Sequence, residues 1–137
     1  MPRSSTLTLM ACFLLAGCSG SKVVPVSGTV TYKGQPVPNA YVHFIPENGR
    51  PSMGETDANG KFTLTYDPEN KGAERGKHRV FFQHNPLADA SRPGAIPGET
   101  APMANEWKEF FAKYGPGKST KTVEITSSMS DLKLELD

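Results

Sequence analysis

Cysteine is almost absent from this 137-residue chain, because the two that occur, Cys12 and Cys18, both lie near its beginning. The remainder therefore forms no internal disulfide and no cysteine metal site, and packing and hydrogen bonds alone must hold it together. Long apolar runs are missing as well. The single apolar stretch, from Leu7 to Ala16, is about half of the roughly twenty residues that a membrane-spanning helix needs.

An excess of charge of either sign is also lacking, since 15 Lys and Arg residues face 14 Asp and Glu residues. No basic stripe is available to neutralise phosphates, so nucleic acid is not expected as a partner. The 13 glycines and 12 prolines are scattered and leave little room for long helices. Short strands joined by turns are predicted instead, in one domain, because the chain is too short for two ordinary ones.

Residues 1–17 have the anatomy of a secretion signal. Arg3 precedes the apolar run, and the small residues Ala16 and Gly17 stand just before Cys18. This pattern is typical of a cleaved signal peptide, and around Cys18 it resembles the lipobox of bacterial lipoproteins. The resemblance implies that the Cys18 thiol is acylated and that Cys18 becomes the first mature residue. An ordinary secretory signal that happens to contain a cysteine is the alternative.

The predicted organisation is a signal peptide (1–17), a lipidated tether (18–24) and a β domain (25–137). Acyl chains hold a protein firmly on a membrane, since each buried methylene adds about 0.8 kcal/mol of affinity. The expected location is therefore the cell envelope, on the periplasmic face of a membrane or in the outer membrane. Ser19 after Cys18 resembles the pattern that permits export to the outer membrane.

Alternation of apolar and polar residues predicts strands through most of the mature chain. Residues 85–105 lose this periodicity and are rich in proline, so a long surface loop is predicted there. Aromatic residues at helical spacing predict one short helix, at about 106–114, ended by Gly115-Pro116. The predicted strands are Val26–Tyr32, Ala40–Pro46, the two arms of a turn at Asn59-Gly60, Lys77–His84, Thr122–Thr126 and Leu132–Leu136. Together they predict an all-β sandwich of about seven strands.

Several short motifs follow one another within residues 24–84. They are Val26-Ser27-Gly28-Thr29-Val30, Gly34-Gln35-Pro36-Val37-Pro38-Asn39-Ala40, Val42-His43-Phe44, Thr56-Asp57-Ala58-Asn59-Gly60-Lys61-Phe62 and Gly76-Lys77-His78-Arg79-Val80. In this order they resemble the carboxypeptidase regulatory-like domains, which implies a single transthyretin-like or Ig-like Greek-key β-sandwich. Together with the lipobox, the whole chain resembles the small lipoproteins of planctomycete bacteria. That resemblance implies fold and location but no specific activity.

Motifs for chemistry are lacking. Asp57-Ala58-Asn59-Gly60 alternates oxygen ligands, but its glycine comes too early for an EF-hand loop, so a hairpin turn is predicted. His78 and His84 lie about 20 Å apart along an extended strand, and His43 belongs to another strand. No metal, cofactor or catalytic residue is predicted, and the chain is expected not to be an enzyme.

Three aromatic residues, Tyr41, Phe81 and Trp107, are candidate ligand contacts, because aromatic rings stack on sugar rings. The alternative is that Trp107 belongs to a helix covering the core and Tyr41 to an ordinary sheet face. The predicted function is a membrane-anchored, non-catalytic binding or structural module whose partner is an envelope protein or glycan. The alternative function is a carbohydrate- or peptide-binding module that presents its ligand to a separate envelope enzyme or transporter.

Overall fold

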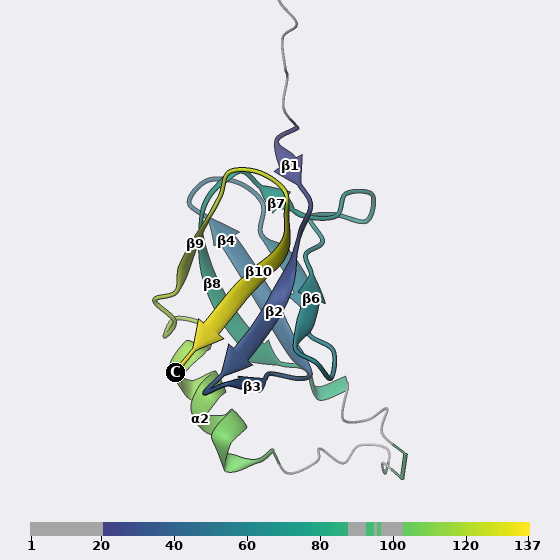
Figure 1. Cartoon of the computed structure of the whole chain (residues 1–137), viewed down its shortest axis with the longest axis vertical. Helices are drawn as coiled ribbons and strands as arrows, with labels where there is room; N and C mark the ends of the chain where they lie inside the picture. Colours follow the sequence, from purple (N-terminus) through teal and green to yellow (C-terminus); the bar gives the residue numbers. More distant parts are fainter. Residues whose placement is uncertain (1–20, 88–92, 95, 97–102) are drawn as a thin grey trace, which may run out of the picture.

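A computed structural model describes residues 21–87, 93–94, 96 and 103–137 of the chain. These residues form a mostly β structure with one short helix (Figure 1). The elements are β1 (Val23–Val24), β2 (Val26–Tyr32), β3 (Gln35–Pro36), β4 (Ala40–Pro46), β5 (Ser52–Glu55), β6 (Lys61–Thr63), β7 (Ala73–Glu74), β8 (Gly76–His84), α2 (Asn105–Tyr114), β9 (Thr122–Ile125) and β10 (Met129–Leu136).

Two four-stranded sheets pack face to face, and a two-stranded ribbon lies at one end of them. In the first sheet β2 is central: β10 pairs with it in parallel, and β3 and β6 pair antiparallel along its other edge. The second sheet has the order β5-β4-β8-β9, and every pair is antiparallel. The ribbon joins β1 to β7. The last strand of the chain therefore lies beside β2, one of the first.

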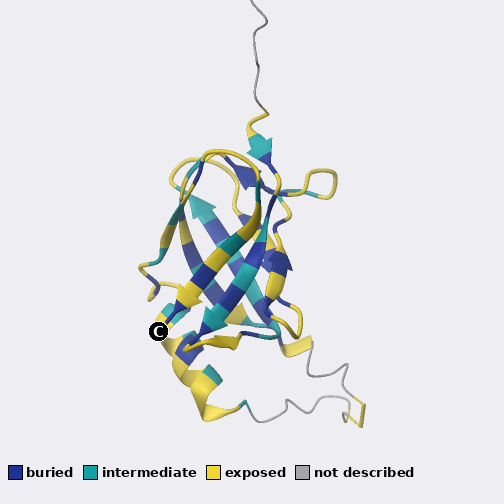
Figure 2. Ribbon diagram, viewed as in Figure 1, coloured by how far each residue is buried: buried dark blue, intermediate teal, exposed yellow. Residues whose placement is uncertain are grey.

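Alternation of side chains gives each sheet one buried side. Along β8, His78, Val80 and Phe82 are buried whereas Lys77 and Arg79 are exposed, and Figure 2 shows the same banding on the other long strands. Each large apolar side chain buried in this way stabilises the fold by about 1.5–3 kcal/mol. The largest fully buried side chains are Phe44, Phe82, Phe110, Leu64, Ile125, Leu134, His78, Val26, Val30, Val37, Val42 and Val80.

Most predicted elements are confirmed. The strands predicted at 26–32 and 40–46 have the bounds of β2 and β4, and the helix begins at Asn105, one residue earlier than expected. Seven of the ten described strands are longer than two residues. In the predicted Asn59-Gly60 turn only Gly60 has a positive φ, +74°, because the Asp57 carboxylate closes the turn by accepting the N–H groups of Asn59 and Lys61. Most of the predicted loop at 85–105 lies outside the described residues.

The connections between strands gather at two opposite ends of the molecule (Figure 1). We call one the tether end; it carries the β1–β7 ribbon and the loops 47–51, 66–72 and 126–128. We call the other the helix end; it carries α2, the turn at 33–34 and the turn at 57–60. The strand registers require this division, since β2, β8 and β10 all run from the tether end to the helix end.

Helix α2 closes the core at the helix end. Phe110 is fully buried, and its ring centroid lies 5.1 Å from that of Tyr32 and 5.2 Å from that of Phe82. Tyr32 ends β2 and Phe82 lies in β8, so Phe110 contacts both sheets. Trp107 and Tyr114 pack at the edge of the same cluster. The helix is therefore part of the core.

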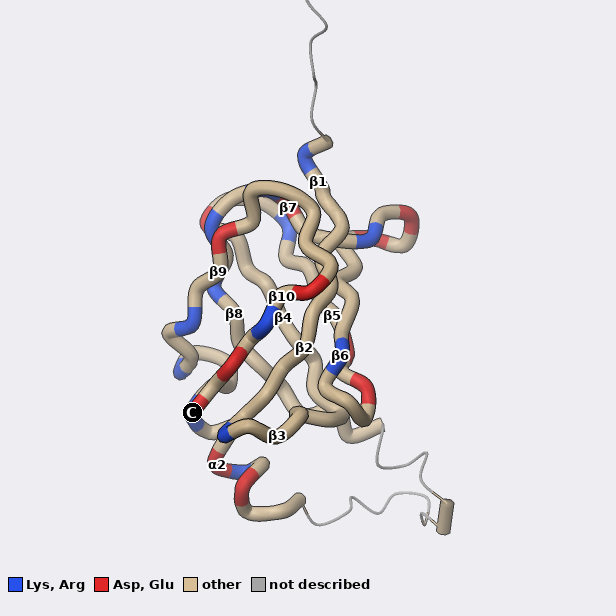
Figure 3. The backbone as a smooth tube through the Cα atoms, viewed as in Figure 1, with Lys and Arg blue, Asp and Glu red and all other residues tan. Residues whose placement is uncertain are grey.

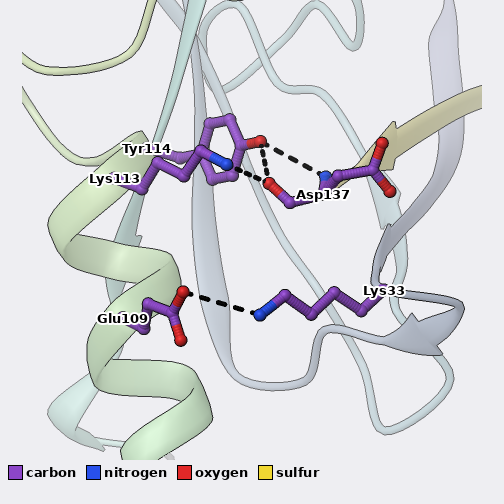
Figure 4. A network of polar contacts seen from close by, with 5 residues as sticks. All are labelled: Lys33, Glu109, Lys113, Tyr114 and Asp137. Atoms are coloured by element: carbon purple, nitrogen blue, oxygen red, sulfur yellow. Dashed lines mark hydrogen bonds and ion pairs between the residues drawn. The ribbon is translucent and has the colours of Figure 1, made fainter.

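A polar network also fastens α2 to the end of β10 (Figure 4). The Tyr114 hydroxyl donates to the backbone oxygen of Asp137 at 2.7 Å, and the Lys113 ammonium group bonds the same oxygen. On the helix surface Lys33 and Glu109 form an exposed ion pair of 3.5 Å, which adds little stability because water screens it. The Asp137 contacts thus hold α2 against the sheet by hydrogen bonds, in addition to the apolar packing of Phe110.

Candidate functional site

The best-built polar cluster among the described residues lies at the tether end. We call Lys22, Tyr66, Glu74 and Arg75 the tether clamp. Glu74 is only 3% exposed; it accepts a 2.7 Å hydrogen bond from the Tyr66 hydroxyl and forms a 3.1 Å ion pair with Lys22. A buried carboxylate is costly unless it is paired and hydrogen-bonded, and both conditions are met here.

The chain leading into the domain is bound by the same cluster. Val23 and Val24 pair with Glu74 and Ala73 in the β1–β7 ribbon. The Arg75 guanidinium donates to the Ser21 carbonyl at 3.0 Å, and its other arm reaches the Thr126 carbonyl. Ser21 to Val24, the last residues of the predicted tether, are thus held against the domain.

Two glycines allow the clamp to close. At Gly49 a Cβ atom would overlap the Glu74 carboxylate, and at Gly72 it would overlap the Val24 carbonyl. Both glycines have a positive φ, of +134° and +120°, which side-chain-bearing residues rarely adopt. The close approach of the 47–51 loop to Glu74, and of the 66–72 loop to Val24, therefore depends on glycine at both positions.

Charges in the clamp stabilise one another. The hydrogen bond from Tyr66 holds the pKa of Glu74 below its ordinary value against the opposing effect of burial, and Lys22 lowers it further. The same contacts raise the pKa of Lys22 and of Tyr66, the hydrogen bond to Glu74 being the main cause in each case. Glu74 is thus a fixed anion at neutral pH and has a structural partner for its charge.

Replacing Glu74 with Gln should reduce the free energy of unfolding of residues 19–137 by about 1–2 kcal/mol at pH 7, because a charged acceptor is exchanged for a neutral one. Folding lowers the pKa of Glu74, so its stabilisation is present above the ordinary value of 4.5 and is lost as pH falls through the lower folded value. Urea unfolding at pH 7 and pH 3 should therefore show a difference between wild type and variant that shrinks at pH 3. Glu69→Gln, in the exposed 66–72 loop, is the matched control; an undiminished difference at pH 3 would contradict this role.

A second candidate site lies on the outer face of the second sheet. Tyr41 and His43 on β4 and Phe81 on β8 point away from the core and are half-buried. His43 and Phe81 are direct cross-strand neighbours, and their rings stack with centroids 4.5 Å apart. Burial lowers the pKa of His43, with Gln83 opposing the shift only in part. The ring therefore stays neutral at physiological pH and extends the aromatic surface.

Basic side chains continue this face toward the tether end. Lys77 and Arg79 precede Phe81 on the same side of β8 and border a surface hollow of about 360 Å³ that Ile45 also lines. Neither cation forms a salt bridge with any residue that the structure describes. Glu47 lines the same hollow and Glu124 is the cross-strand neighbour of Lys77, so this face presents charges of both signs beside its aromatic rings.

The structure brings together only two of the three predicted ligand contacts. Tyr41 and Phe81 share the outer face, whereas Trp107 lies on α2, half-buried, with its ring 6.5 Å from that of Tyr32. Trp107 therefore belongs to the cluster that covers the core. Cys18, the predicted acylation site, lies outside the described residues.

Within the described ranges, no three His, Cys, Asp or Glu side chains converge to hold a metal ion. His78 is buried and its Nε2 donates to the Glu74 carbonyl at 2.8 Å, while His43 lies on the opposite face of the sheet. In the same ranges, no helix has the length and apolar character needed to cross a bilayer.

Sequence reasoning missed the tether clamp and the basic part of the outer face. Parity along the predicted strand at 77–84 already places Lys77, Arg79 and Phe81 on one side, so the outer face was accessible to it. The clamp carried no such signal, because Lys22 is far from Tyr66, Glu74 and Arg75 in the chain and no local pattern joins them. Compared with known proteins, the chain matches no family model, no curated protein and no solved structure.

Proposed function

We propose that this chain is a lipid-anchored lipoprotein of the bacterial cell envelope, whose β domain is a non-catalytic binding or structural module. Acyl chains on Cys18 hold it on the membrane, and the domain has the transthyretin-like sandwich of the carboxypeptidase regulatory-like domains. The observation that carries the proposal is the fixed tether: Arg75 binds the chain at Ser21, three residues after Cys18. A domain attached so close to its lipid is suited to a permanent place on a membrane.

The fold supports the sandwich part of this proposal. Two antiparallel-rich sheets face each other across one apolar core, to which both contribute buried residues at alternate positions. The motif residues have structural roles in this arrangement. Val30 and Phe62 are buried, and Gly28 lets β10 approach β2, since a Cβ there would overlap the Leu132 carbonyl.

A non-catalytic role is supported by what the titratable side chains do. Glu74 is paired in the tether clamp, Asp57 closes a turn, and His78 donates its Nε2 proton to a backbone carbonyl. Each has a structural partner that accounts for its place. Hydrolysis would require a nucleophile within hydrogen-bond reach of a base, and these groups are committed elsewhere.

A second candidate function follows from the outer face of the second sheet. Tyr41, His43 and Phe81 form a half-buried aromatic surface beside the hollow bordered by Lys77 and Arg79. Such a surface favours the alternative of a carbohydrate- or peptide-binding module that presents its ligand to a separate envelope enzyme or transporter.

Capture from the cell envelope distinguishes the two functions. Cells would be cross-linked, the acylated full-length protein captured from a detergent extract with an antibody, and bound material identified by mass spectrometry. The test variant is Tyr41→Ala with Phe81→Ala; Thr29→Ala with Thr31→Ala, on the outer face of the first sheet, is the matched control.

A protein partner recovered with all three forms would support an organising module. A glycan or peptide recovered with wild type and control, but lost from the aromatic variant, would support the second function. Recovery of nothing above background would contradict any binding role.

A further inference from the structure

The position of the tether determines which end of the domain lies near the membrane. Consecutive Cα atoms are about 3.8 Å apart, so the three steps from Cys18 to Ser21 span at most about 11 Å. Ser21 is itself held in place. The Arg75 side chain donates a hydrogen bond to the Ser21 carbonyl, and the backbone N–H of Arg75 donates to the carbonyl of Lys22, the next residue. An acylated Cys18 therefore keeps the tether end within about a nanometre of the lipid headgroups.

The clamp makes this attachment stiff. The ribbon between β1 and β7 begins only two residues after Ser21, and the Arg75 side chain connects it to the 126–128 loop. A second connection fixes the start of β2, since Met129 donates its N–H to the Pro25 carbonyl at 2.9 Å. The chain from Ser21 onward is therefore held to the domain, and the three steps from Cys18 to Ser21 set the reach between the lipid and the tether end.

The charge of the tether end does not oppose an approach to the membrane surface. The charged residues of the tether end are balanced (Figure 3): four are basic, Lys22, Arg50, Lys71 and Arg75, and four are acidic, Glu47, Asp67, Glu69 and Glu74. A negatively charged headgroup layer attracts basic residues and repels acidic ones within a Debye length of about 8 Å. A balanced surface experiences little net force, so the short tether decides the orientation.

We infer that the tether end rests on the lipid headgroups, through the loops 47–51, 66–72 and 126–128, and that the helix end faces away from the membrane. This inference rests on the proposed acylation of Cys18. It assigns the membrane surface as the partner of the tether end and places α2 on the side of the domain away from the membrane. Figure 1 shows β1 and α2 at opposite ends of the molecule.

Site-directed labelling tests the orientation in the acylated full-length protein. The mature domain contains no cysteine other than Cys18, so one introduced thiol gives one label. The two variants are Glu69→Cys, in the 66–72 loop, and Glu106→Cys, on α2; both replace an exposed glutamate. Each would carry a fluorophore and be reconstituted in phosphatidylcholine vesicles that contain a nitroxide-headgroup lipid.

Quenching by the nitroxide lipid is expected to be several-fold greater at position 69 than at position 106. Equal quenching of vesicle-bound protein, or stronger quenching at 106, overturns the orientation while leaving the anchor intact. Protein that does not float with the vesicles overturns the anchor and the orientation together.

A linker insertion tests whether the short tether is what sets the orientation of the domain. Ten Gly and Ser residues inserted between Gly20 and Ser21 add about 17 Å of root-mean-square reach and leave the acylation site unchanged. Flotation should persist while quenching at position 69 falls toward the value at 106. Unchanged quenching at position 69 would overturn the claim that the short tether sets the orientation.

Discussion

Replacing Cys18 with Ser is expected to move the protein almost completely from the membrane fraction to the soluble fraction. A serine hydroxyl does not take the place of the thiol that receives the acyl group, so the methylenes that each add about 0.8 kcal/mol of membrane affinity are lost. The apolar run at 7–16 is too short to replace them, since a spanning helix needs about twenty residues. Fractionation by ultracentrifugation after an alkaline wash, followed by immunoblotting, measures the change.

Cys12 provides a matched control for this experiment, because it is the only other cysteine in the chain and lies within the apolar run. Cys12→Ser should leave the protein in the membrane fraction. An unchanged distribution of Cys18→Ser, or an equal shift of both variants, would contradict acylation at Cys18.

Replacing Phe110 with Ala is expected to cost about 3–5 kcal/mol of folding free energy, as for other buried phenylalanines. Its ring is fully buried and lies against Tyr32 and Phe82, one from each sheet, so neither neighbour can fill the cavity without leaving its strand. Small domains have a total stability of about 5–15 kcal/mol, and a large part of it would therefore be lost.

The single Trp, Trp107, reports this loss directly because it lies on the same helix, with its ring 6.4 Å from that of Phe110. Urea unfolding followed by Trp fluorescence and by far-ultraviolet circular dichroism measures the stability of residues 19–137. Phe111→Ala is the control: Phe111 is the next residue but is only half-buried, so a smaller loss is expected. Equal losses for the two variants would contradict the role of α2 as part of the core.

The long strands could be predicted from the sequence because apolar residues recur at the alternate, buried positions, although outward-facing Tyr41, Ile45 and Phe81 are apolar as well. Val26, Val30 and Tyr32 on β2 and Val80 with Phe82 on β8 show this alternation over a whole strand. Helix α2 could be predicted because its aromatic residues recur at helical spacing and Gly115-Pro116 ends it. Local pattern is sufficient wherever burial is decided within one element.

Other features depend on residues far apart in the chain and left no local pattern. The β1–β7 ribbon pairs Val23 with Glu74, and two-residue strands are too short for alternation to appear. The parallel pairing of β10 with β2 joins the last strand of the chain to one of the first, and it includes a register shift between Met129 and Leu132. Such pairings follow from the packing of the whole fold.

The candidate sites also divide into residues that the sequence identified and contacts that only the folded chain shows. Tyr41 and Phe81 were predicted as ligand contacts because their aromatic rings could stack on a sugar, and the structure places both on one face. Trp107 was grouped with them because it is aromatic, but helix packing directs it to the core cluster. The tether clamp was not predicted, since the pairing of Lys22 with a buried Glu74 becomes evident only once the β1–β7 ribbon has formed. Composition identifies candidate residues, and three-dimensional position decides which of them act together.

Mass spectrometry of the mature N-terminus tests the central claim most directly. The protein would be purified from the membrane fraction of the source cells, digested, and its N-terminal peptide isolated. We expect a peptide that begins at Cys18 and carries the mass of a diacylglyceryl group on the thiol. An N-terminal peptide that begins at any other residue, or an unmodified Cys18, would contradict the account of this protein as a lipid-anchored module of the cell envelope.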